Sequence, residues 1–356
     1  MDTSDQLGFF DLTHRYDALT AKGDPLEHLA QQIPWAGFGK MLEKSLRRSK
    51  RTKGGRPPFD AILMFKILVL QALYNLSDDQ TEYQIRDRLS FMRFLGLDLH
   101  QRIPDAKTIW LFRETLAQAG VVEKLFKQFD TYLAAQGLQA RGGQLIDASL
   151  VPVPKQRNTR EENATVQAGE CPAEWEAQPA KRRQKDTDAR WTKKHGVSHF
   201  GYKNHVNVDK THKLIRRYTV TDAAVHDSQV LEDVLQSKAA GRDVWGDAAY
   251  RSDEIEAQLK KRKLRSKMQY KGYRASPLTP AQQHTNQRRS RIRARVEHIF
   301  GHQAMAMGGT LIRTIGQIRA RAKIGLKKLA YTFQRFLVLT TVCREQTVKP
   351  WGGERS

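Results

Sequence analysis

Three carboxylates stand in sequence surroundings that disfavour an unpaired acid: Asp147, Asp247 and Glu297. Asp147 interrupts a short apolar run, and Asp247 follows a second such run and a glycine. Glu297 is the only acid between residues 257 and 344, a stretch that holds 21 Lys and Arg. Three acids that met at one point would repel one another unless divalent cations lay between them. Because two such cations can activate a water or a 3′-hydroxyl and stabilise the leaving oxygen of a phosphodiester, the pattern predicts metal-dependent chemistry on nucleic acid.

Each of these acids also has an ordinary interpretation. Asp147 and Asp247 could form Asx turns or caps at strand ends. Glu297 could pair with Arg293 or Arg289 on the surface of a helix. We favour the metal site because all three acids occur in one strongly basic chain.

The composition narrows the classes of partner. The chain has 61 Lys and Arg against 38 Asp and Glu, a net charge of +23, which favours a polyanion such as nucleic acid. No stretch reaches 18 apolar residues and the N-terminus lacks the pattern of a signal peptide, so no membrane partner is expected. Two distant cysteines, Cys171 and Cys343, fit a reducing, cytoplasmic and nucleoid-associated location. Cys171 with His195 and His199 offers too few ligands for zinc.

Apolar runs and capping residues predict the elements that position the acids. We expect strands at about 144–151, 200–208, 214–220, 243–250 and 264–270, and helices at about 229–235, 253–261, 288–300 and 315–339. Asp227 and Ser228 are expected to cap the first of these helices. Asp247 would lie at the carboxyl end of a strand, where open α/β sheets place their sites. This order predicts an α/β fold, a mixed sheet flanked by helices, with the polar residues 155–198 as a long loop or insertion.

Residues 1–56 end in a basic arm from Lys40 to Arg56. Its arginines are expected to contact DNA phosphates: Arg47, Arg48, Arg51 and Arg56. A solvated linker is the alternative interpretation of this arm.

Residues 57–138 have the pattern of a helical domain. Phe59–Leu70 is apolar nearly all round and predicts a buried helix. Ser77 or Asp78 can cap the next helix, and Asp105 a third. Short helices with exposed arginines fit a helix-turn-helix-like DNA reader, and fit a helical dimerisation or scaffold module equally well.

Five motifs follow one another along the chain: Leu145–Ser149, Phe200–His205, Val220–Ser228, Gly246–Tyr250 and Arg293–His298. Together they resemble the bacterial insertion-sequence DDE transposases of the InsH-like branch. The resemblance covers about residues 54–339, and residues 55–59 and 68–96 are similar to that branch's N-terminal helical domain. It implies a helical DNA-binding domain at 57–138, an RNase H-like catalytic domain at 139–342 and a C-terminal tail at 343–356. It also implies Asp147, Asp247 and Glu297 as the catalytic and metal-binding triad, with Mg²⁺ or Mn²⁺, two ions, as cofactor.

The chain departs from its relatives at two positions. Many relatives carry a tyrosine three residues before the arginine that corresponds to Arg293. They also carry a lysine seven residues after the glutamate that corresponds to Glu297. Those positions hold Ser290 and Ala304. Nearby side chains that could grip phosphate in their place are Arg289, Arg291 and Gln303, and the basic helix expected to bind DNA also contains Arg295.

The resemblance implies a transposase that binds the terminal inverted repeats of an insertion sequence and catalyses DNA cleavage and strand transfer. Its partners would be double-stranded DNA, as transposon ends and as target, and further copies of itself in a dimer or larger assembly. Two alternatives stay open: a catalytically silent or domesticated DNA-binding protein, and an RNase H-like nuclease.

Overall fold

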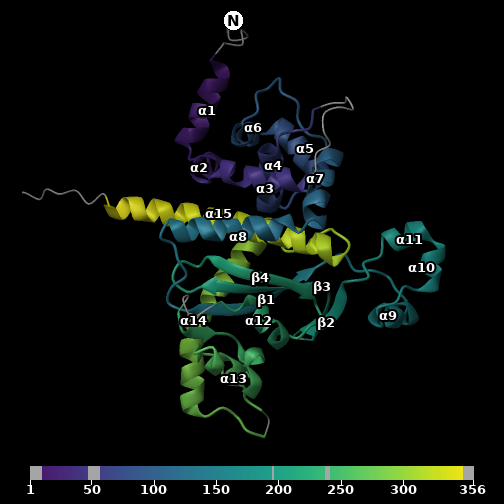
Figure 1. Ribbon diagram of the computed structural model, residues 1–356, viewed down its shortest axis with the longest axis vertical. Coiled ribbons are helices and arrows are strands. Elements are labelled where there is room, and N and C mark those ends of the chain that lie inside the picture. The colour runs from purple at the N-terminus through teal and green to yellow at the C-terminus, as the bar shows by residue number, and fades with distance from the viewer. Residues whose placement is uncertain (1–9, 47–56, 195, 237–240, 274, 348–356) are drawn as a thin grey trace, which may run out of the picture. The chain divides into compact units, whose positions relative to one another are not determined.

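A computed structural model describes residues 10–46, 57–194, 196–236, 241–273 and 275–347 of the chain, with side chains described up to residue 341 (Figure 1). The expected DNA contacts of the basic arm, Arg47, Arg48, Arg51 and Arg56, lie outside the described residues, as does His195. By packing, the chain divides into two compact units, residues 1–121 with 333–356 and residues 122–332. The helix at Val121–Ala135, α8, therefore belongs almost wholly to the second unit.

The first unit is built from helices: α1 Asp11–Ala21, α2 Pro25–Gln32, α3 Trp35–Ser45, α4 Ala61–Tyr74, α5 Asp78–Asp87, α6 Leu89–Leu95 and α7 Ala106–Gln118. As expected, α4 is buried along most of its length, since it is apolar on nearly every face. Phe65 of α4 meets the rings of Trp35 and Phe38 edge-on. The predicted caps form: Ser77 closes a capping box on α5, and Asp105 accepts a hydrogen bond from the backbone of Thr108.

Within the described part of the chain, no single helix is long and apolar enough to cross a membrane. Only α4 and α5 taken together reach the required composition, and their axes are bent by 103°.

The second unit holds a six-stranded sheet: β1 Gln144–Pro152, β2 Arg190–Lys194, β3 Val197–Asp209, β4 Ile215–Asp222, β5 Asp243–Trp245 and β6 Arg265–Ser266 (Figure 1). The long strand β3 pairs with β1 along one edge, and along the other edge first with β2 and then with β4, all antiparallel. β1 and β5 are parallel, as are β5 and β6. The order β4-β3-β1-β5-β6, with antiparallel and parallel pairs, confirms the expected mixed sheet of an α/β fold.

Two apolar clusters pack against the sheet of this unit. One joins Ile146 and Val244 to α12 (Leu231–Val234) and α13 (Asp253–Lys261). The other joins Val151 of β1 to Ile324 of α15 (Gln317–Thr347). Side chains alternate along a strand, so Ile146 and Val151 face opposite ways and helices cover both sides of the sheet. The basic helix α14, Pro280–Met305, packs against β1 and β5.

The segment at 155–198 differs from the expected loop. It contains three short helices, α9 Arg160–Gln167, α10 Ala173–Ala177 and α11 Pro179–Arg183, and it supplies the edge strand β2. Trp175 is fully buried and donates a hydrogen bond to Glu162, 2.6 Å away. That bond comes first among the causes that lower the pKa of Glu162 to about 2. One buried tryptophan organises this insertion, and a single residue leaves no apolar periodicity in the sequence.

Three further boundaries need correction. β5 ends at Trp245 and β6 has only two residues, because the chain turns into short 3-10 and loop segments after each. The helix expected at 229–235 is a 3-10 turn, Asp227–Val230, followed by α12. Its cap is His226, whose ring nitrogen accepts from the backbone of Ser228, and not Asp227 or Ser228.

Candidate active site

Asp147 lies in the middle of β1 and is held by two hydrogen bonds. Its Oδ1 accepts from the backbone nitrogen of Ala148 at 2.8 Å, and its Oδ2 accepts from Nη2 of Arg293 at 3.1 Å. Only 14% of the Asp147 side chain is exposed. Burial raises the pKa of Asp147, the Arg293 guanidinium opposes that rise, and the carboxylate of Asp247 adds to it.

The sheet register brings Asp247 to the same place. Leu145 of β1 pairs with Trp245 of β5 in parallel, so Asp147 and Asp247 each follow two residues beyond one matched pair. Neighbouring strands lie about 4.8 Å apart, so Asp247, just past the end of β5, stands beside Asp147 in the middle of β1.

The turn after β5 fixes the orientation of Asp247. Its Oδ1 accepts from the backbone nitrogen of Ala249 at 2.9 Å and caps the 3-10 turn Ala248–Tyr250. A Cβ at Gly246 would lie 2.4 Å from the sulfur of the buried Met268, so a larger residue here would force that side chain to shift.

Glu297 stands on α14 one turn after Arg293, and its side chain is exposed. Residues four apart share a helix face, so Glu297 borders the face through which Arg293 reaches Asp147. Among the described residues, no three His, Cys, Asp or Glu side chains are grouped closely enough to hold a metal ion. The structure therefore brings two members of the expected triad together, and the approach of Glu297 stays a prediction.

A family described as Transposase DDE domain matches residues 139–333, and a second, described as Transposase domain (DUF772), matches residues 14–115. The chain belongs to the DDE transposase family. Among solved structures, the chain is similar to a piggyBac transposase synaptic complex with hairpin DNA, seen by cryo-EM, at 11% sequence identity. That match covers 92% of this chain and 76% of the other, with a TM-score of 0.46.

Gln269 links two residues of α14 in this DDE domain. It accepts from Nη1 of Arg293 at 2.8 Å and donates to the hydroxyl of Ser290 at 2.6 Å. Ser290, one of the two departures from relatives, thus helps to place Arg293 beside Asp147. Gln269 could not be found from the sequence, because a glutamine between two elements gives no pattern of its own.

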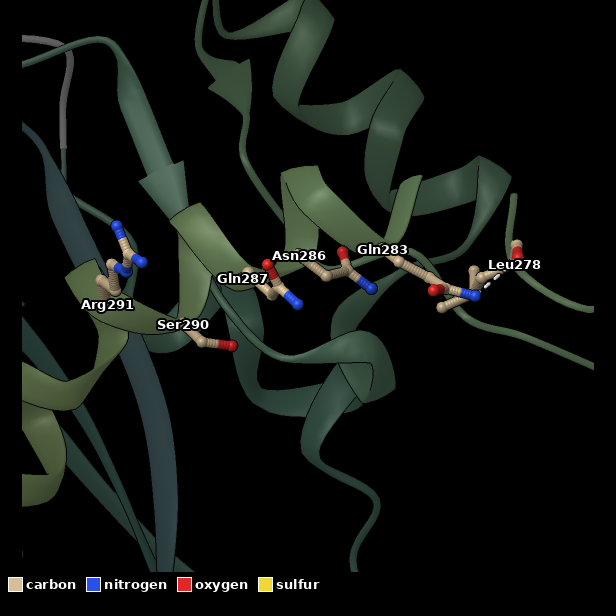
Figure 2. A pocket seen from close by; sticks show the side chains of 6 residues that line it. All are labelled: Leu278, Gln283, Asn286, Gln287, Ser290 and Arg291. Atoms are coloured by element: carbon tan, nitrogen blue, oxygen red, sulfur yellow. Dashed lines mark hydrogen bonds between the residues drawn. The ribbon is translucent and has the colours of Figure 1, made fainter. Parts of the chain in front are cut away.

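The other basic residues of α14 divide into two kinds. Arg289 donates to the backbone oxygen of Met268 and stacks over the ring of Tyr270, while Arg295 donates to the backbone oxygen of Lys210. These bonds fix the turns that flank the site. Arg291 is exposed and lines an open hollow of about 550 Å³ along the first half of α14, shown in Figure 2 with the other side chains that line it: Leu278, Gln283, Asn286, Gln287 and Ser290.

Two further polar residues belong to the surroundings of the acids. The hydroxyl of Tyr250 is buried and has no hydrogen-bond partner among the described residues. Burial raises its pKa, and the carboxylates of Asp227, Asp147 and Asp247 raise it further. Asp227 forms an ion pair with Lys203 at 3.1 Å. Asp227 belongs to the motif Val220–Ser228, but from the sequence its expected role is that of a helix cap.

Proposed function

We propose that this DDE family member is an active insertion-sequence transposase of the InsH-like branch. It binds terminal inverted repeats and catalyses cleavage and strand transfer of DNA. The observation that supports the proposal is the pair Asp147 in β1 and Asp247 just past the end of β5, which the parallel register of these two strands sets side by side. A protein that only binds DNA gains nothing from a desolvated acid, Asp147, with a second carboxylate beside it that repels it.

Enzymes with DDE domains use divalent metal ions, and the residues present here fit such ions. Asp147 and Asp247 offer hard oxygen ligands, and Arg293 is the single cation hydrogen-bonded to Asp147. We expect Mg²⁺ or Mn²⁺, two ions, to be held by these two acids with Glu297. When bound, the ions would activate the attacking oxygen and stabilise the leaving oxygen of the phosphodiester.

Arg293 has two roles in this proposal. In the DNA-free protein it is the counter-ion of Asp147, held by Gln269. Once a cation replaces it there, its guanidinium can bind a phosphate close to the reacting bond. Arg291 and the amide side chains of the hollow along α14 offer further contacts to the DNA backbone.

The direct test is strand transfer in vitro, with purified protein, Mg²⁺ and DNA that carries the ends of the element. Cleaved ends joined to target DNA support a transposase. End binding without cleavage would instead favour the silent DNA-binding protein, and cleavage without joining or end preference would favour a nuclease.

Arg293→Ala should lower strand transfer by about 10- to 100-fold, because a charged hydrogen bond contributes roughly 1.5–3 kcal/mol. Loss of the guanidinium also raises the pKa of Asp147 further, so less of the carboxylate is charged at a given pH. Part of the loss should therefore return as the pH is raised. The matched control is Arg321→Ala on α15, an exposed arginine 3.6 Å from Glu123, expected to cost less than about fivefold. Equal, small losses in both variants would make Arg293 ordinary surface charge.

Binding to DNA should depend strongly on salt. Residues 288–328 hold eleven Lys and Arg against one acid. If six of them contact phosphates, the slope of log K against log salt should lie near −5, from about −0.9 per contact. The measurement is a series of binding titrations between low and physiological salt. A slope shallower than about −2 would mean that this basic surface does not face DNA.

Residues up to about 138 should supply most of the recognition of the ends, because their short helices and basic arm fit groove and phosphate contacts. A fragment that begins at Val122, and so keeps α8 with the rest of the second unit, should bind terminal-repeat DNA and random DNA alike. The full chain, assayed beside it, should prefer the repeat. Retained preference in the fragment would move end recognition into the catalytic domain.

A transposase acts on two DNA ends, so we also expect a dimer or larger assembly of this protein on DNA. We expect it in the cytoplasm, at the nucleoid.

A further inference from the structure

A small cavity lies on the same face of β1 as Asp147, further along the strand. Its volume is about 50 Å³, several times the ~10–15 Å³ that one water molecule needs. Ser149 and Val151 form its floor, since they alternate with the same period as Asp147. The end of α14, the loop after it and α15 supply the remaining lining residues: Phe300, Gln303, Thr310, Ile312, Lys323, Ile324, Lys327 and Lys328.

Two lysines bring positive charge to this cavity without a carboxylate beside them. Lys328 is 3% exposed, donates to Oε1 of Gln303 and lies 5.7 Å from the ring centre of Phe300. Lys327 donates to the backbone oxygens of Met307 and Gly309. These acceptors are neutral, and none of the described residues that line the cavity is acidic.

The missing counter-charge is costly for the protein. Burial lowers the pKa of Lys328 to about 7, with the charge of Lys327 adding to the effect, and burial lowers the pKa of Lys327 to about 8. A buried ammonium is stabilised when an anion lies against it.

The side-chain amide of Gln303 is a second feature that indicates a ligand site. Lys328 can only donate, so the amide of Gln303 must turn its oxygen toward that ammonium. Its Nε2 is buried, and no described residue offers it an acceptor. A buried amide donor without an acceptor loses free energy that a ligand oxygen would restore.

We propose that this cavity binds one tetrahedral oxyanion, a phosphate group, through Lys328, Lys327 and the free amide nitrogen of Gln303. The hydroxyl of Ser149, which accepts from Asn204 at 3.2 Å, can give its own proton to the same ligand. The exposed Thr310 and the half-buried Lys323 border the side through which the ligand enters. The phosphate comes either from free orthophosphate or from the backbone of bound DNA. In both cases the phosphate lies beside Ser149, which is two residues after Asp147 on the same face of β1.

The test uses the full chain without DNA, titrated with potassium phosphate against potassium chloride at equal ionic strength and followed by calorimetry. Wild type should bind one orthophosphate per chain in a saturable way. Lys328→Met, which keeps the length of the side chain, should weaken binding about tenfold or more, and Gln303→Leu should weaken it as well. Lys260→Met on α13 is the control, because it removes the same charge from an exposed position.

A second arm distinguishes the source of the phosphate. If wild type ignores orthophosphate, the salt dependence of DNA binding is compared between Lys328→Met and Lys260→Met. A backbone phosphate in the cavity requires a slope shallower by about 0.9 in the first variant only. Removal of a desolvated charge should leave Lys328→Met folded, and if it does not fold, Gln303→Leu decides each arm. Equal effects of the Lys328 and Lys260 substitutions, or no effect in either arm, would overturn the proposal.

Discussion

Asp247→Asn is expected to abolish cleavage and joining of DNA while end binding stays close to that of the wild type. The amide keeps the shape of the side chain and can still accept from the backbone of Ala249. It loses the negative charge that holds a cation beside Asp147. Loss of several kcal/mol of transition-state stabilisation corresponds to a rate at least about 10³-fold lower, since each ~1.4 kcal/mol is tenfold.

The measurement is cleavage and strand transfer in Mg²⁺, with end binding measured on the same samples. Asp253→Asn is the matched control, since it removes one exposed carboxylate from the first turn of α13 and should leave the rates unchanged. Activity of Asp247→Asn within about tenfold of wild type would rule out a direct role in holding metal. That result would not contradict the proposed phosphate site, because the test of that site measures anion binding and not DNA cleavage.

Arg216→Met is expected to destabilise the catalytic unit by about 3–5 kcal/mol, the range for breaking a buried ion pair on one side. The Arg216 side chain is 2% exposed and lies 2.8 Å from Asp130 and 3.3 Å from Asp209. Asp209 is fully buried, so loss of the guanidinium leaves its charge with His212 as the remaining ionisable partner.

Urea unfolding of the wild type and the variant measures this loss. The neighbour Arg217 is exposed and donates only to the backbone oxygen of Leu235, so Arg217→Met should cost about 1 kcal/mol or less. A cost for Arg216→Met as small as that of its neighbour would show that water replaces the guanidinium without penalty.

Much of the architecture could be predicted because patterns within short segments indicate single strands and helix starts. Alternating or continuous apolar runs predicted β1, β3 and β4, and capping residues such as Ser77 and Asp105 predicted helix starts that the structure contains. The expected α/β class follows from the order of those segments. The helices inside the predicted insertion at 155–198 were not predicted, because they are too short to show an apolar period in the sequence.

The unusual acids can be recognised from the sequence, because a charged residue in an apolar strand or alone in a basic stretch needs no structure to be seen. How these acids meet depends on tertiary contacts. The register of β1 with β5 sets Asp147 beside Asp247, and the packing of α14 sets Arg293 and Gln269 against them. The proposed phosphate cavity could not be predicted from the sequence either, because Ser149, Gln303 and Lys328 come from three separate segments. Backbone pairing and side-chain packing bring together residues that are far apart in sequence. Local sequence preferences do not indicate which of those distant residues will be in contact.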